Sequence, residues 1–139
     1  MEKHKENTQA AQAFQQMIKL TIPGTLPGLN EYTRANRSDP RAGNKMKQKA
    51  QEMIEWNIIS QLKGKLKPPI KISYLWIEQA KRRDLDNIAF AQKFVQDALV
   101  KLGSIPDDGW GYIGGFTHDF AVDRKNPRVE ITIYEKGEW

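Results

Sequence analysis

The sequence predicts a single compact α+β domain in which helices pack on a small mixed sheet, in the order β-α-β-α-β-β. Several short segments alternate apolar with polar residues, as half-buried strands do, and two longer segments repeat apolar residues at helical spacing. The 139 residues suffice for one domain and are too few for two. We expect residues 17–139 to form this domain and residues 1–16 to be a polar tail or a short helix.

The first half of the chain predicts a strand, a loop and a helix. Residues 18–22 alternate apolar with polar side chains, and Pro23-Gly24 ends this strand. The stretch from Asn30 to Asn44 is polar, and we expect a loop there. A helix follows and ends before Gly64. Its apolar stripe consists of Met46, Ala50, Met53, Ile54, Ile58 and Leu62.

The second half predicts a strand, a helix and two further strands. Apolar residues at every second position indicate a strand over Ile70–Ile77. A helical stripe begins at Leu85 and runs to Gly103, a natural C-terminal glycine cap. Alternation around residues 112–122 and 129–134 indicates the last two strands.

Composition limits the kinds of site and partner. The chain has no cysteine and only two histidines, so a bound metal must have oxygen ligands. A net charge of +5 favours polyanionic partners. No apolar run approaches the roughly 20 residues that span a bilayer, and residues 1–16 do not have the pattern of a secretory signal. We therefore expect a cytoplasmic protein with no membrane partner.

Asp84 and Asp86 are the strongest candidates for chemistry. If the segment is extended, side chains two residues apart point to one face, and two converging carboxylates suit a divalent cation. The structural alternative is that Asp86 is the N-cap of the following helix and Asp84 is a solvated neighbour. A basic cluster, residues 81–83, directly precedes the pair and suits a phosphate. A second acidic pair, Asp107-Asp108, lies in a stretch that is also ordinary turn sequence.

The run Arg82-Arg83-Asp84-Leu85-Asp86-Asn87, with Asp97-Ala98-Leu99, Lys101, Gly103 and Asp107-Asp108 after it, resembles the RusA family of Holliday-junction resolvases, which are typical of prophages. The similarity extends from about Ile18 to Tyr134. The resemblance implies an endodeoxyribonuclease that acts as a homodimer on four-way DNA junctions. It also implies a metal site formed by Asp84, Asp86 and Asp108, and a lysine on the following helix that is needed for cleavage.

The position of that lysine departs from the family pattern. The family lysine follows the second aspartate by four residues, where this chain has Phe90. Aligning the later motif moves the lysine to Lys93. Seven residues from Asp86 is nearly two helical turns, so Lys93 would return to the same face but ~4.5 Å further along the axis. The alternative is a surface lysine that pairs with Asp97.

The sequence therefore predicts Mg²⁺-dependent hydrolysis of the DNA backbone, and the resemblance implies that it proceeds by paired symmetric nicks. Asp84, Asp86 and Asp108 would hold the metal, and Lys93, or else Arg82 or Arg83, would stabilise the transition-state charge. No small-molecule substrate is expected. The alternatives are a non-catalytic module that binds branched DNA, and a nuclease that cuts flaps or forks. The expected contacts to DNA phosphates come from Arg34, Arg37, Arg41, Lys45, Lys47, Lys49, Arg82 and Arg83.

Overall fold

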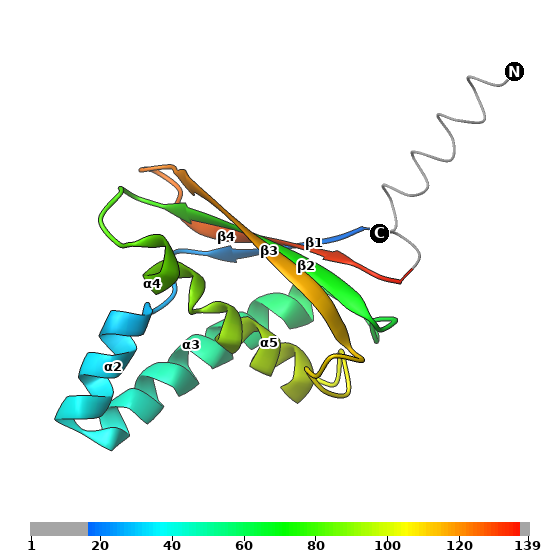
Figure 1. Cartoon of the computed structure of the whole chain (residues 1–139), viewed down its shortest axis with the longest axis horizontal. Coiled ribbons are helices and arrows are strands. Elements are labelled where there is room, and N and C mark those ends of the chain that lie inside the picture. The colour runs from blue at the N-terminus through cyan, green and yellow to red at the C-terminus, as the bar shows by residue number, and fades with distance from the viewer. Residues whose placement is uncertain (1–16, 137–139) are drawn as a thin grey trace, which may run out of the picture.

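A four-stranded mixed sheet is the central element of the fold (Figure 1). The computed structural model describes residues 17–136. The strand order is β1-β4-β2-β3, and β4 pairs antiparallel with both of its neighbours, whereas β2 and β3 are parallel. The predicted polar tail lies outside the described residues. The strands are β1 (Ile18–Pro23), β2 (Ile70–Glu78), β3 (Ile113–Val122) and β4 (Arg128–Tyr134).

The helices cover one face of this sheet, which confirms the predicted α+β class. Strand residues on the helix side are buried, as the alternation predicted, and Tyr74 and Trp76 of β2 are among the largest buried side chains. Ala50, Ile54 and Ile58 of the long helix belong to the same buried core. No helix in the described part of the chain is long and apolar enough to cross a membrane. The helices are α2 (Leu29–Ser38), α3 (Pro40–Gln61), α4 (Leu85–Ala89) and α5 (Gln92–Lys101).

The predicted polar loop from Asn30 to Asn44 is wrong, because α2 and the start of α3 occupy it. Helix α2 buries no residue completely, so its sequence carries no apolar stripe. The start of α3 is fixed by Asp39, whose side chain accepts a hydrogen bond of 3.0 Å from the backbone N–H of Arg41, and by Pro40 at the first helical position.

The predicted continuous helix from Leu85 to Gly103 is also wrong. The chain leaves α4 at Phe90 and enters α5 at Gln92, and Figure 1 shows the two helices as separate segments. Ala91, between them, is completely buried, and Phe90 packs with its ring centroid 5.7 Å from that of Tyr32. The break between α4 and α5 therefore occurs where Ala91 is buried and Phe90 packs against Tyr32 of α2. The predicted cap is confirmed, since Gly103 has a φ of 75°.

Candidate active site

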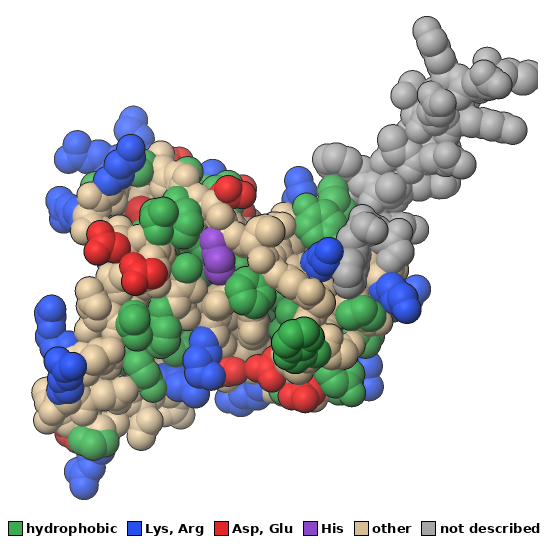
Figure 2. Space-filling model, in the orientation of Figure 1, with side chains coloured by type: hydrophobic (Ala, Val, Ile, Leu, Met, Phe, Trp, Pro, Cys, Tyr) green, Lys and Arg blue, Asp and Glu red, His purple; other side chains and the backbone are tan. Residues whose placement is uncertain are grey.

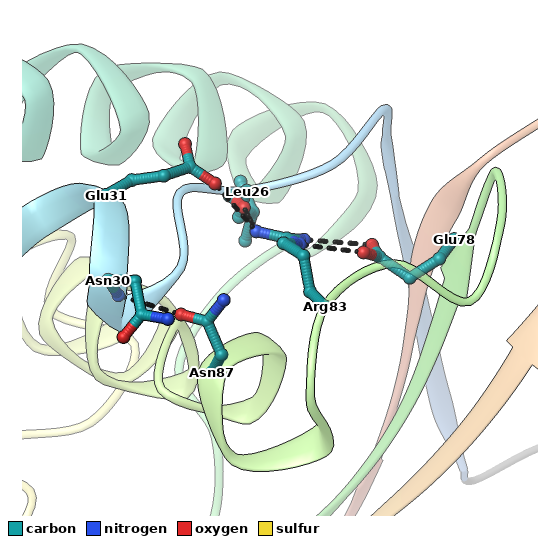
Figure 3. A network of polar contacts seen from close by, with 6 residues as sticks. All are labelled: Leu26, Asn30, Glu31, Glu78, Arg83 and Asn87. Carbon is teal, nitrogen blue, oxygen red and sulfur yellow. Dashed lines mark hydrogen bonds and ion pairs between the residues drawn. The ribbon is translucent and has the colours of Figure 1, made fainter.

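Arg83, which directly precedes the two aspartates of the segment from Arg83 to Asn87, is anchored inside the protein. Its Nε and Nη2 donate hydrogen bonds of 2.8 and 3.0 Å to the two carboxylate oxygens of Glu78, at the end of β2 (Figure 3). Its Nη1 donates to the carbonyl of Leu26 at 2.9 Å and to Glu31 at 3.2 Å. Burial alone would lower the pKa of Arg83, but the hydrogen bonds and charges of Glu78 and Glu31 raise it. Arg83 thus ties the segment to β2 and α2.

The last residue of the segment, Asn87, is a second anchor. It is buried, and its Oδ1 accepts a hydrogen bond of 2.8 Å from the backbone N–H of Asn30 in the first turn of α2 (Figure 3). The N-cap of α2 is Gly28, which has no side chain that could accept a hydrogen bond from the first turn of the helix. A Cβ on Gly28 would lie 2.6 Å from Asn87 Oδ1 and 3.0 Å from Arg83 Nη1. The glycine allows both anchors to approach the loop before α2.

The two aspartates between these anchors face the solvent. Asp84 is the extended N-cap of α4 and its side chain makes no capping hydrogen bond, while Asp86 lies within the first turn. Both residues are exposed, and within residues 17–136 neither carboxylate has a hydrogen-bond or ion-pair partner. The helix starts between them, so the extended-chain geometry expected from the sequence is wrong, as is an N-cap role for Asp86. Both carboxylates are available to a ligand from outside.

A hollow lies beside Asp84, between α4 and the ends of β2 and β3. Its charged lining includes Glu78 and Lys81, and its apolar lining includes Ile88 and Phe120. Apolar side chains therefore form part of the surface next to the Asp84 carboxylate. The hollow borders the motif segment at Asp84, and this makes the region the candidate active site.

The structure does not bring Asp108 to this hollow. Asp108 lies in the turn before β3 and lines a different hollow with Phe116. Phe120 belongs to the first hollow, and four strand residues at ~3.3 Å each separate the two phenylalanines by ~13 Å. Within residues 17–136, no three Asp, Glu or His side chains are placed to hold one metal ion. Of the three predicted aspartates, Asp84 and Asp86 are therefore neighbours at the start of α4, and Asp108 borders a different hollow.

Lys93 is exposed on α5 and forms the ion pair that its spacing to Asp97 predicted. Its Nζ lies 3.9 Å from Asp97 Oδ2, and the Nζ of Lys47 lies 3.7 Å from the same oxygen. Contrary to the prediction from the sequence, Lys93 does not share a helical face with Asp86, because the break between α4 and α5 separates them. Its catalytic role stays a prediction.

Two basic surfaces flank the carboxylates. Figure 2 shows acidic side chains in the region of α4, with Lys and Arg side chains above them and others below, over α2 and α3. We call the lower group the hairpin surface; its predicted members other than Lys47 have no ion-pair partner within residues 17–136. The members of the hairpin surface are Arg34, Arg37, Arg41, Lys45, Lys47 and Lys49.

The upper group contains two residues that the sequence reasoning missed. Arg124 and Lys125 lie in the β3–β4 turn, and the backbone N–H of Asp123 donates a 2.9 Å hydrogen bond to the carbonyl of Glu78. This bond joins the turn to the end of β2, just before Lys81 and Arg82. All four basic side chains are exposed. We call Lys81, Arg82, Arg124 and Lys125 the tip surface.

His118, on β3, has a structural role. Its Nδ1 accepts a hydrogen bond of 2.9 Å from Nε1 of the buried Trp76, and its ring stacks on Tyr74 at 5.1 Å between centroids. Burial lowers the pKa of His118, and the nearby charge of Asp119 only partly offsets this. The neutral ring of His118 therefore accepts the hydrogen bond of the buried Trp76 N–H.

Two exposed carboxylates between two basic surfaces, on a small α+β frame, define a protein that acts on a phosphate backbone. The comparison with protein families agrees, because the family model of endodeoxyribonuclease RusA matches residues 3–134. The chain belongs to the RusA family of endodeoxyribonucleases, which resolve Holliday junctions. A search of the curated proteins found no match.

Proposed function

We propose that this protein is a Mg²⁺-dependent endonuclease that resolves four-way DNA junctions by paired symmetric nicks. The proposal rests on the arrangement of side chains in the segment from Arg83 to Asn87. Arg83 and Asn87 are anchored inward, and the two aspartates point outward between the hairpin and tip surfaces, with no partner within residues 17–136. The family membership supports DNA cleavage, and the metal and the symmetry of cutting are the proposed additions.

The chemistry of the donor set fits Mg²⁺. The ion prefers oxygen ligands and uses one or two protein carboxylates, together with water and substrate phosphate. Asp84 and Asp86 would supply those carboxylates, and we propose Asp108 as a third ligand, which requires residues 106–108, before the hydrogen-bonded turn at Gly109, to shift toward α4. The bound ion would supply an activated water and neutralise charge on the scissile phosphate.

The chain's own residues would position the DNA and stabilise its charge. The hairpin and tip surfaces would bind phosphates on either side of the carboxylates, which fixes the register of the strand without reading its sequence. Arg82 is exposed beside Asp84 and would donate to the phosphate as negative charge grows, a role also proposed for Lys93. Arg83 would act mainly by positioning the segment, because Glu78, Glu31 and the Leu26 carbonyl already engage its guanidinium.

We propose that the active form is a homodimer acting in the cytoplasm. Resolution needs two nicks at symmetric positions, and a two-fold protein presents two identical sites to a junction of matching symmetry.

One observation favours a second candidate, a non-catalytic module that binds branched DNA. Within residues 17–136, no three acidic or histidine side chains converge on one point, so metal binding would depend on two aspartates alone. A nuclease for flaps or forks is a further alternative. It would use the same residues but would cut single strands without symmetry.

Cleavage of a synthetic four-way junction separates these functions. Each strand is labelled in turn and incubated with the protein in Mg²⁺ or in EDTA. We expect paired nicks at symmetric positions in Mg²⁺ only, and a loss of more than ~100-fold in Asp84→Asn. Asp119→Asn is the matched control, because Asp119 is an exposed aspartate of β3 outside this hollow. Tight binding without cutting would establish the module, and asymmetric nicks on several branched substrates would establish the flap nuclease.

A further inference from the structure

A second hollow, at the start of β3, has the chemistry of a nucleobase site. Trp110 lies on its rim and is 99% exposed, and Phe116 of β3 is 47% exposed. Exposed aromatic rings are the usual platforms on which unpaired bases stack, since every base has a π face. The two rings lie in one concave surface with the turn that contains Asp108.

Backbone hydrogen bonds fix the turn that carries this indole. Trp110 lies in a turn in which the carbonyl of Gly109 accepts hydrogen bonds of 2.9 and 3.0 Å from the N–H groups of Tyr112 and Ile113. Ile113 begins β3, so the turn is tied to the sheet. A side chain presented by a bonded turn loses less freedom on binding than one on a loose loop.

The hollow also has polar groups and a suitable size. Gln96 of α5 contributes an amide, whose Nε2 donates to the hydroxyl of Tyr74 at 3.4 Å, and its carbonyl oxygen remains available as an acceptor. Gly114 and Gly115 leave the wall free of side chains. The hollow has a volume of about 290 Å³. Small-ligand sites occupy roughly 300–1,000 Å³, so this hollow is about as large as the smallest of them and suits a single base.

We infer that this hollow holds one unpaired nucleobase of the branched DNA, stacked on Trp110 and Phe116. The inference rests on the proposed DNA substrate and adds a base contact at a fixed distance from the carboxylates. The ~13 Å along β3 between Phe116 and Phe120 equals about four base steps at ~3.4 Å each. We therefore expect the bound base to lie about four nucleotides from the phosphate that is cut.

The test measures junction binding in EDTA, so that cleavage does not interfere. We expect Trp110→Ala to weaken binding about tenfold, since stacking contributes ~1–3 kcal/mol per base, and Trp110→Phe to restore most of it. Trp56→Ala is the matched control, because Trp56 is 74% exposed on α3. Full exposure of Trp110 means that its replacement leaves the fold intact, which the melting temperature verifies.

Junctions with single abasic sites identify the contact. An abasic site is placed in turn at each position within four nucleotides of the cut. We expect it to weaken wild-type binding at one of these positions. At that position the abasic site should leave the affinity of Trp110→Ala unchanged. The inference is overturned if Trp110→Ala binds as the wild type does, if its defect is the same on every abasic junction, or if it alters only the oligomeric state. Failure of the wild type to bind any junction would overturn the proposed function itself and this inference with it.

Discussion

Replacing Arg83 by leucine removes the guanidinium that anchors the aspartate segment. The side chain of Glu78 is only 12% exposed and would lose two hydrogen bonds and its counter-charge. Stranding one member of a buried pair costs ~3–5 kcal/mol, and this partly exposed pair should cost about 3 kcal/mol. The unfolding entropy is ~2.1 cal/mol/K per residue. For 139 residues the loss corresponds to a fall of about 10 °C in Tm.

Thermal and urea unfolding of paired variants would test this value. Arg82→Leu is the control, because the side chain of this exposed neighbour has no partner in the described part of the chain, and its Tm should change by less than ~2 °C. The double variant Arg83→Leu with Glu78→Leu should regain part of the loss, since it removes the stranded charge. Equal Tm values for the Arg83 and Arg82 variants would refute the anchoring role.

Three further predictions concern the same region and its sheet. Asp86→Asn should leave Tm unchanged or raised, because its carboxylate has no partner within residues 17–136, and Mg²⁺ should stabilise the wild type more than this variant; a clear fall in Tm would contradict the metal role. Asn87→Ala should cost ~1–2 kcal/mol in urea unfolding by removing the partner of the α2 N–H, and a neutral result would exclude the anchor. The lowered pKa of folded His118 means that protons favour the unfolded chain, so its contribution is complete above about pH 6.5 and is lost as pH falls through the folded pKa. Tm should therefore fall more between pH 7 and pH 5 in the wild type than in His118→Gln, and parallel falls would contradict this.

The strands could be predicted because their pattern is local. Ile70, Ile72, Tyr74 and Trp76 alternate with less buried residues, and the structure buries all four. The pairing order could not be predicted, because hydrogen bonds between β2 and β4 join residues that are far apart in the sequence. Helix α2 was missed for a similar reason, since the side chain that bonds its first turn is Asn87, 57 residues away.

The candidate site was predictable in its residues and not in its geometry. The motif marked Asp84 and Asp86, but it did not show that Arg83 and Asn87 are the anchors and the aspartates the exposed groups. Arg124 and Lys125 form only a charged pair in the sequence, and their place beside Lys81 depends on a backbone bond between two strand ends. The distance of Asp108 from the first hollow likewise depends on the course of β3.

The most direct test of the proposed site is a titration with Mn²⁺, which accepts the same oxygen ligands as Mg²⁺ and can be followed by electron paramagnetic resonance. Wild-type protein should bind the ion, and Asp84→Asn and Asp86→Asn should each lose most of this binding, while Asp119→Asn should retain it. Unchanged Mn²⁺ binding in both Asp84→Asn and Asp86→Asn would contradict the assignment of these carboxylates to the metal.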